Sequence, residues 1–209
     1  MAVDFVHPVQ AVVPGAQGRV LAVLAETTAP LNLSTLARLA GVSVAQASRV
    51  MPGLVELGLV ERREIPPSSQ FRLIRENVAA QAIIELARSR EAALSQIGSA
   101  ASDLPIPPVS VIVFGSIARG DADRQSDLDV IVVRPNDVDD DDDVWATAIE
   151  QWRSAAQAIT GNTIDVLEVT QDEARTKLSG NAQLWRDVAR DGTVVYGLTM
   201  NELRERVHA

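Results

Sequence analysis

The first third of the chain has apolar residues at helical spacing, followed by two short strand-like stretches. In residues 18–26, Val20, Leu21, Val23 and Leu24 give an apolar helical pattern. Two more helical patterns follow, and then two strand-like stretches surround the segment Pro66-Pro67-Ser68-Ser69. The pattern predicts helices at residues 18–26, 35–40 and 44–57 and strands at residues 59–63 and 70–73.

Residue types at the helix ends support these boundaries. Ser34 and Ser43 are placed to cap the second and third helices, because a serine side chain accepts hydrogen bonds from the unpaired N–H groups of the first turn. Gly58 is a stop signal for the third helix. Pro52-Gly53 interrupts that helix, where an interior proline costs about 3 kcal/mol and a glycine about 1 kcal/mol. We therefore expect a kink or a restart of the helix at this point.

A longer amphipathic pattern without proline, and without glycine before Gly98, predicts a helix over residues 77–101. We interpret it as a link between two domains, and a homodimer surface is a second interpretation. The prolines of residues 102–108 mark a boundary. The expected organisation is a domain at 1–76, a linking helix and linker at 77–104, and a second domain at 105–209.

Beyond this boundary, short apolar runs alternate with helical patterns, so the whole chain is expected to be α+β with a mixed α/β second domain. Trp145 and Trp152 share one helix face and are expected in the core. The acidic run Asp139–Asp143 is expected to be a solvated loop, because neighbouring carboxylates repel one another. The pattern predicts strands at residues 111–114, 130–133, 163–169 and 194–197 and helices at residues 144–159, 171–178 and 182–190.

Two aspartates and a Gly-Ser pair stand at the ends of the first two of these strands. Gly115-Ser116 follows the apolar run that ends at Phe114, and Asp127 and Asp129 open the next apolar run. Because alternate residues of a strand point to the same face, we expect the two carboxylates to converge. Mg²⁺ takes oxygen ligands and usually binds through one or two carboxylates together with substrate phosphates. The pattern is therefore typical of a site for Mg²⁺ beside a phosphate.

This segment resembles the core signature of the DNA polymerase β-like nucleotidyltransferase superfamily. The signature is an apolar strand, a Gly-Ser-x-Ala-Arg-Gly turn, a spacer and Asp-x-Asp in the next strand. The matching residues are Gly115, Ser116, Ala118, Arg119, Gly120, Ser126, Asp127 and Asp129. The resemblance implies that Asp127 and Asp129 bind Mg²⁺ or Mn²⁺ and that an NTP is the substrate. It also implies a phosphate-binding group formed by Gly115, Ser116, Arg119, Gly120 and Ser126.

In the resembled family, a third carboxylate on a neighbouring strand completes the metal site or takes the proton from the attacking group. Asp165, within the apolar strand at 163–169, is the candidate for this catalytic and metal-binding position. An aspartate in an apolar strand costs free energy unless its carboxylate is satisfied, which favours a role in the site. A water-facing aspartate at a strand edge is the alternative interpretation. Glu168 lies on the opposite face of the strand and is the second choice.

The first third of the chain resembles the winged helix-turn-helix family, and residues 33–50 and 54–63 carry this resemblance. In that family the third helix enters the major groove and the wing contacts the DNA backbone. A winged helix used for dimerisation or protein docking is the alternative, because Arg49 is the one basic residue between Val44 and Leu57. The resemblance implies base contacts by Ser43, Gln46 and Arg49 and phosphate contacts by Arg62, Arg63 and Arg72.

Composition and charge narrow the function classes. The chain has no cysteine and two histidines, His7 and His208, so we expect no disulfide, Cys-ligated zinc site or Ser-His hydrolase. Without a run of about 20 apolar residues or a signal-peptide pattern, we expect a cytoplasmic protein with no membrane partner. The formal net charge is −9, yet residues 18–76 carry seven arginines against five acids. Only this third suits nucleic acid electrostatically.

Two hypotheses about function follow. The first is an Mg²⁺-dependent nucleotidyltransferase that moves an NMP from an NTP to a hydroxyl of a protein or an RNA. About 40 residues follow Val169, few for a substrate-binding domain, which favours a macromolecular acceptor or a site shaped by a second subunit. The resembled family includes members of toxin–antitoxin pairs, and the winged helix favours such a regulatory setting. The second hypothesis is a DNA-binding regulator whose transferase domain senses nucleotide or is inactive.

Overall fold

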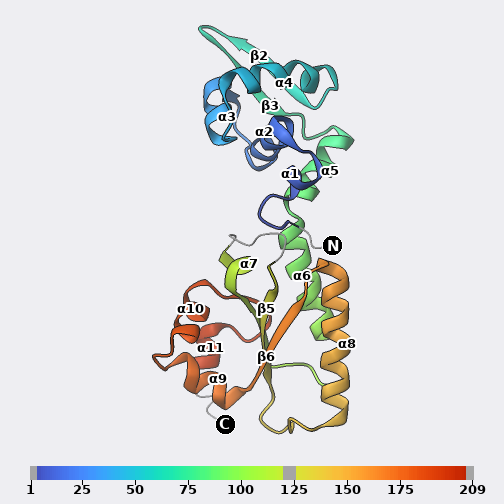
Figure 1. The fold of residues 1–209 in the computed structure, drawn as a ribbon, viewed down its shortest axis with the longest axis vertical. Coiled ribbons are helices and arrows are strands. Elements are labelled where there is room, and N and C mark those ends of the chain that lie inside the picture. The colour runs from blue at the N-terminus through green and yellow to red at the C-terminus, as the bar shows by residue number, and fades with distance from the viewer. Residues whose placement is uncertain (1–3, 120–125, 206–209) are drawn as a thin grey trace. The chain divides into compact units, whose positions relative to one another are not determined.

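The computed structural model describes residues 4–119 and 126–205, so Gly120 and His208 lie outside the described residues. The chain divides into two compact units. One comprises His7–Ser89, and the other comprises Arg90 and the residues after it, together with the short segment before His7. Each unit has its own hydrophobic core. Figure 1 shows the helices and strands of both units.

The N-terminal unit combines helices with a small antiparallel sheet. Its strands follow the order β1-β3-β2, and β2 and β3 form a ribbon around Pro66-Pro67. Apolar residues of the helices and of this sheet, among them Leu21, Leu36, Leu54 and Phe71, share one core. The elements are α1 (Pro8–Val12), α2 (Gly15–Glu26), β1 (Leu31–Asn32), α3 (Leu33–Leu39), α4 (Val44–Glu56), β2 (Val60–Ile65), β3 (Ser68–Leu73) and α5 (Val78–Ala87).

The residue that caps α4 is the one predicted from the sequence, whereas the residue that caps α3 is a different one. Ser43 caps α4 as expected, in a capping box with Gln46. Asn32, rather than Ser34, caps α3, because α3 begins earlier than predicted. The Asn32 side-chain oxygen accepts a hydrogen bond from Thr35 N–H at 2.8 Å.

Of the two outcomes expected at Pro52-Gly53, a kink or a restart, the restart does not occur, because α4 continues as one helix to Glu56. Pro52 lies on the exposed side of the helix, whereas Met51 and Leu54 are buried on its inner side. Burying a large apolar side chain contributes about 1.5–3 kcal/mol. The packing of the two flanking residues therefore offsets the lost backbone hydrogen bond.

A four-stranded mixed sheet forms the centre of the C-terminal unit (Figure 1). The strand order is β6-β5-β4-β7, in which β5 is antiparallel to β4 and parallel to β6. Strand β7 pairs antiparallel with β4. The elements are α6 (Ser89–Ser102), β4 (Ser110–Phe114), α7 (Gly115–Arg119), β5 (Leu128–Arg134), α8 (Asp143–Thr160), β6 (Ile164–Thr170), α9 (Gln171–Leu178), α10 (Gln183–Asp191), β7 (Thr193–Gly197) and α11 (Met200–Arg204).

Helices cover both faces of this sheet, and the period-2 alternation of the strands assigns residues to the two faces. One face packs against α6 and α8 through Val111, Val113, Val130 and Val132, and Trp145 and Trp152 are buried there as expected. The other face packs against α9, α10 and α11 through Ile112, Ile131 and Val133. Alternation along β5 places Asp129 on this second face, beside Ile131.

The helical pattern over residues 77–101 forms two helices, α5 and α6, where the sequence predicts one. Helix α5 ends at Ala87, and α6 begins at Ser89. The polar residues Arg88, Ser89 and Arg90 interrupt the apolar pattern at this joint, and the two compact units divide there. None of the described helices is long and apolar enough to cross a membrane.

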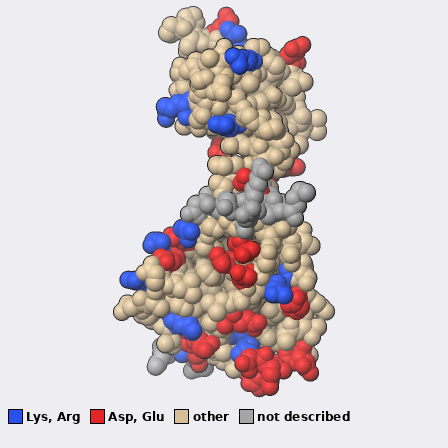
Figure 2. Space-filling model, viewed as in Figure 1, with Lys and Arg blue, Asp and Glu red and all other residues tan. Residues whose placement is uncertain are grey.

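The acidic run Asp139–Asp143 follows the end of β5 that is opposite to Asp129. Its members are exposed apart from Asp142, whose side chain caps α8 by accepting from Trp145 N–H at 2.9 Å. Carboxylates gather at this end of the unit on the face shown in Figure 2. The run is therefore a solvated loop and helix start, as expected, and lies away from the aspartates of the predicted site.

Candidate active site

The junction of β4 and α7 brings the backbone against an aspartate. Gly115 follows β4 and starts α7 with φ of +74°, in the left-handed region that favours glycine. The sequence predicts a turn and loop here, and the structure forms a five-residue helix instead. A Cβ added at Gly115 would collide with the Asp129 carboxylate, whose Cγ would lie only 3.1 Å away. Gly115 therefore allows the backbone to approach the Asp129 carboxylate closely, whereas a larger residue would require this carboxylate or α7 to shift.

Strand register places two aspartates side by side. Asp129 lies opposite Phe114 in the antiparallel β4–β5 ladder and opposite Asp165 in the parallel β5–β6 ladder. Residues directly opposite each other on paired strands project from the same face of the sheet. Asp127 directly precedes β5 and is exposed, as is Asp165, whereas Asp129 is half-buried. Asp129 and Asp165 therefore share one face of the sheet where β5 and β6 begin, and Asp127 lies two residues before Asp129.

These three carboxylates repel one another in the folded protein. Burial raises the pKa of Asp129 above its ordinary value, and the charges of Asp165 and Asp127 raise this pKa further. The Arg119 guanidinium acts in the opposite direction and lowers it. The site thus carries an excess of negative charge that a bound cation would neutralise.

The donor set fits a hard divalent cation that binds jointly with a phosphate. Among the described residues, no three carboxylates, histidines or cysteines are grouped closely enough to hold an ion by themselves. Mg²⁺ commonly uses one or two protein carboxylates and completes its coordination with water and substrate phosphates. Asp127, Asp129 and Asp165 offer the carboxylate oxygens that Mg²⁺ and Mn²⁺ prefer.

A buried asparagine that the sequence analysis did not identify holds the segment before Asp127. Asn162 is only 3% exposed, and its Nδ2 donates to the backbone oxygen of Ser126 at 2.9 Å. Next to this contact, Leu128 N–H donates to Thr163 O at 2.8 Å. The two bonds tie the start of β5 to the start of β6, where the aspartates lie. A turn pattern at Gly161-Asn162 predicts a change of chain direction but not this contact.

Comparison with known families assigns both units. Residues 94–185 match the nucleotidyltransferase domain family, and residues 18–64 match the IclR helix-turn-helix domain family. The chain contains a nucleotidyltransferase domain and a helix-turn-helix domain. The expected architecture, an N-terminal winged helix-turn-helix followed by a mixed α/β nucleotidyltransferase domain, is confirmed. The first match spans β4, α7, β5 and β6, and with them the three aspartates.

Several solved structures resemble part of the nucleotidyltransferase. A toxin–antitoxin structure with AMP-PNP is 17% identical with a TM-score of 0.37, and the match covers 53% of this chain and 80% of that chain. A mutant of the toxin–antitoxin MntA-HpeT is 15% identical with a TM-score of 0.38, and the match covers 53% of this chain and 80% of that chain. RV1404 from Mycobacterium tuberculosis is 26% identical with a TM-score of 0.33, and the match covers 44% of this chain and 67% of that chain. Among curated proteins, none matches the sequence.

Glu168, the second choice for the third carboxylate, makes a different contact in the nucleotidyltransferase domain. Its Oε2 accepts a hydrogen bond from Trp145 Nε1 at 2.7 Å, and Trp145 is a buried residue of α8. Alternation along β6 places Glu168 on the α8 side of the sheet and Asp165 on the other side. Asp165 is therefore the β6 carboxylate that shares a face with Asp129.

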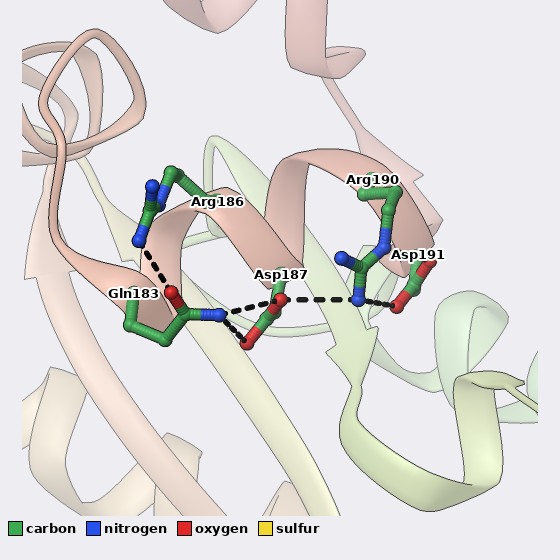
Figure 3. A network of polar contacts seen from close by, with 5 residues as sticks. All are labelled: Gln183, Arg186, Asp187, Arg190 and Asp191. Atoms are coloured by element: carbon green, nitrogen blue, oxygen red, sulfur yellow. Dashed lines mark hydrogen bonds and ion pairs between the residues drawn. The ribbon is translucent and has the colours of Figure 1, made fainter.

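Helix α10 carries a polar network and contacts α7 of the nucleotidyltransferase domain. Figure 3 shows its members, which are Gln183, Arg186, Asp187, Arg190 and Asp191. The Arg190 guanidinium donates twice to Asp191, at 2.7 and 2.9 Å, and contacts Asp187 at 3.0 Å. Arg190 lowers the pKa of Asp191, and Arg119 of α7 lowers it further. Arg119 thus lies within electrostatic reach of both Asp129 and Asp191.

Of the other predicted phosphate-binding residues, Ser116 lies within α7 and Ser126 lies before β5. Ser116 is the second residue of α7 and is half-buried. Ser126 directly precedes Asp127, is half-buried, and is held through its backbone oxygen by Asn162. Gly120 lies outside the described residues. The structure therefore brings Ser116 next to Gly115 and Ser126 next to the aspartates.

In the helix-turn-helix domain, strands β2 and β3 form the wing. The three arginines of the wing that are predicted to contact phosphates form ion pairs with glutamates of the wing. Glu61 binds Arg63 at 2.7 Å and also binds Arg72, while Arg62 contacts Glu64 at 3.1 Å. Arg63 and Arg72 hold the pKa of Glu61 below its ordinary value. The two glutamates therefore balance most, but not all, of the positive charge of the three wing arginines.

The three predicted base contacts on α4 differ in what they bind. Ser43 Oγ accepts from Gln46 N–H at 3.1 Å, and Gln46 Oε1 accepts from Ser43 N–H at 2.9 Å. Both side chains are therefore engaged in capping the helix. Arg49 is exposed on α4 and takes no part in the cap. Of the three, Arg49 is the one that could reach a base without breaking a capping bond.

Proposed function

We propose that this nucleotidyltransferase moves a nucleoside monophosphate from an NTP to a hydroxyl of a macromolecular acceptor, a protein or an RNA, with Mg²⁺ or Mn²⁺ as cofactor. The convergence of Asp127, Asp129 and Asp165 beside Gly115 carries the proposal. Packing of the sheet does not require three carboxylates at one place, since each raises the energy of the others. A site that holds a cation and a triphosphate explains why they are there.

The three aspartates have different roles in this proposal. Asp127 and Asp129 hold the cation, which when bound polarises the reacting phosphoryl group and stabilises charge on the leaving pyrophosphate. Asp165 completes the ligand set or accepts the proton of the attacking hydroxyl. Its exposure, beside the half-buried Asp129, leaves it accessible to an acceptor.

The residues around α7 bind the triphosphate. Gly115 lets the backbone approach without a Cβ in the way, and Ser116 offers its hydroxyl and N–H to the β- and γ-phosphates. Arg119 either neutralises phosphate charge or pairs with an acid to fix the loop, and its reach to Asp191 supports the second role. Gly120 belongs to this group by its place in the sequence motif, and Ser126 orients the turn before Asp127.

The helix-turn-helix domain on the same chain favours a regulatory setting over modification of a small molecule. A toxin–antitoxin pair is the setting that we propose, with a partner protein or an RNA as acceptor. The deciding experiment uses four α-labelled NTPs with Mg²⁺ or Mn²⁺ in lysate of the source organism, with the wild type beside Asp127→Ala. A labelled band that appears only with the wild type would establish transfer, the base and the acceptor class. Absence of label with every NTP, together with no thermal stabilisation by NTP, would contradict the proposal.

Replacing Asn162 by Ala should lower the turnover of nucleotidyl transfer by about 10- to 100-fold, because misplacement of a reacting group by about 1 Å can reduce rates 100-fold. The variant loses the bond to Ser126 O that precedes Asp127. Asn136→Ala is the matched control, since Asn136 also bonds a backbone group, Asp172 N–H, but outside the site. Steady-state kinetics and thermal unfolding should be measured for both. Equal losses of activity in the two variants would contradict a specific role for Asn162.

DNA binding by the helix-turn-helix domain is a second candidate function, favoured by a groove beside α4. The groove, of about 820 Å³, lies between the start of α3, α4 and the wing. Hydroxyl and amide groups bind phosphate and sugar oxygens without reading sequence. Arg49 of α4 would supply base contact. Its lining also has apolar residues, among them Met51, Val55 and Phe71, and the polar residues that line it are Asn32, Ser34, Thr35, Ser48, Glu56, Arg62, Ser68 and Ser69.

Glu61→Gln should tighten the binding of duplex DNA by about 5-fold, because it releases Arg63 and Arg72 for phosphates. Arg49→Ala should weaken binding by a similar factor. Glu26→Gln, an exposed acid of the same unit, is the control for the change in net charge. Fluorescence anisotropy at fixed salt would measure all three. Unchanged affinity in both Glu61→Gln and Arg49→Ala would remove the DNA-binding role.

A further inference from the structure

An arginine outside the sequence motif binds backbone carbonyls in the C-terminal part of helix α7. Arg90 is the second residue of α6 and is half-buried. Its Nε donates to the backbone oxygen of Ile117 at 3.0 Å, and its Nη2 donates to that of Ala118 at 2.7 Å. Both acceptors lie in the C-terminal part of α7 and are 27 and 28 positions away in the sequence. One side chain thus donates hydrogen bonds to two successive backbone carbonyls.

This contact satisfies a physical need of α7. The last carbonyls of any helix have no partner within the helix, and α7 has only five residues. The planar guanidinium matches two neighbouring acceptors with a fixed pair of N–H groups, and its positive charge stabilises the negative end of the helix. A lysine would supply the charge but not the paired geometry.

The same short helix begins at the point that approaches the aspartates. Ala118 is three positions after Gly115, a distance of about 4.5 Å along a helix. A shift at the end that Arg90 holds is therefore transmitted to Gly115, whose backbone lies against the Asp129 carboxylate. Ala93 and Ile97 of α6 share a hydrophobic core with Ile117 of α7, so apolar packing also holds α7 against α6.

We propose that Arg90 is a positioning residue for nucleotidyl transfer: it fixes α7 so that Gly115 and Ser116 present their backbone to the triphosphate beside Asp129. The proposal rests on the proposed function of this site. Arg90 acts through α7 and not on the substrate, because its two bonds go to backbone oxygens. A role limited to stabilising the fold is the alternative that the test must exclude.

The test compares Arg90→Ala and Arg90→Lys with Arg88→Ala, which removes an exposed arginine two positions earlier. Arg90→Ala should lower kcat for transfer by about 10- to 100-fold, and ethylguanidinium added to this variant should restore part of the rate. Arg90→Lys should keep the thermal midpoint near that of the wild type yet remain at least about 5-fold slower, because it lacks the paired donors. Arg88→Ala should match the wild type.

Hydrogen exchange of the α7 amides provides a readout that does not require activity. Arg90→Ala should speed exchange in α7 while exchange in β4, β5 and α8 stays unchanged. Wild-type rates of transfer and of α7 exchange in Arg90→Ala would overturn the proposal, as would a loss of activity that follows global unfolding and is not rescued. If the wild type transfers no nucleotide, the proposed function fails. The α7 exchange rates then still decide whether Arg90 fixes this helix.

Discussion

Replacing Asp129 by Asn should lower nucleotidyl transfer by about 1,000-fold or more and yet raise the thermal stability of the C-terminal unit. The loss follows from removal of a proposed cation ligand, since stabilisation of transition-state charge by a metal contributes several kcal/mol. The gain follows from the removal of a half-buried charge that Asp165 and Asp127 repel. After allowance for solvent screening, we expect a rise of about 3 °C in the midpoint, corresponding to roughly 1 kcal/mol or less.

The pH dependence of this gain has a defined sign. The pKa of Asp129 is raised in the folded protein, so its contribution to stability is fully present below the unfolded value of about 4 and is lost as pH rises through the folded pKa. The midpoint difference between Asp129→Asn and the wild type should therefore be larger at pH 7 than at pH 4. Thermal unfolding without added metal at both pH values measures it.

Asp137→Asn is the matched control for this experiment, because Asp137 is exposed in the loop after β5. It should leave activity and the midpoint unchanged. Addition of Mg²⁺ with NTP should stabilise the wild type and Asp137→Asn but not Asp129→Asn, since ligands stabilise only the state that binds them. Full activity in Asp129→Asn, or a lower midpoint at pH 7, would contradict the assignment of this carboxylate.

Gly115→Ala should reduce transfer by at least about 100-fold and destabilise the C-terminal unit by about 3 kcal/mol. Two effects add in this variant. The backbone of Gly115 has φ of +74°, which is unfavourable for alanine by about 1–2 kcal/mol, and the new Cβ would meet the Asp129 carboxylate. Relief of the collision requires α7 or Asp129 to move, and either movement separates the phosphate-binding backbone from the carboxylates.

Two other glycines separate these effects. Gly41 has φ of +59° and no atom within 4 Å of an added Cβ, so Gly41→Ala measures the backbone penalty alone, at about 1 kcal/mol. Gly53 lies within α4 and also has open space around it, so Gly53→Ala should be neutral or stabilising by up to about 1 kcal/mol. Chemical denaturation and transfer assays apply to all three variants. If Gly115→Ala were no worse than Gly41→Ala, the contact with Asp129 would be unimportant.

The sequence predicts those features that depend on local spacing. Asp127 and Asp129 stand at alternate positions, and Asp165 interrupts an apolar strand, so the period of a strand predicts that these carboxylates share a face. The register places Asp129 opposite Asp165. Gly115 is predictable as a point of close approach for the same reason. The roles of these residues in catalysis stay predictions that the experiments above test.

The features that the sequence does not predict depend on contacts between distant segments. Asn162 and Arg90 bind backbone oxygens, and any residue type offers a backbone oxygen, so no complementary side chain marks the partner. Likewise, whether α4 continues through Pro52 depends on the burial of its neighbours against other helices. Local propensity gives the cost of such a residue but not the packing that offsets it.

The paired wing has a consequence for how the helix-turn-helix domain would compete for DNA in a cell. Binding to DNA is driven largely by release of counterions, and the affinity falls with salt in proportion to the number of phosphates that the protein neutralises. Arg62, Arg63 and Arg72 already have carboxylate partners in Glu61 and Glu64, so few counterions would leave the DNA. Occupancy of a site would then depend little on ionic strength, and the bulk of the genome would act as a weak competitor.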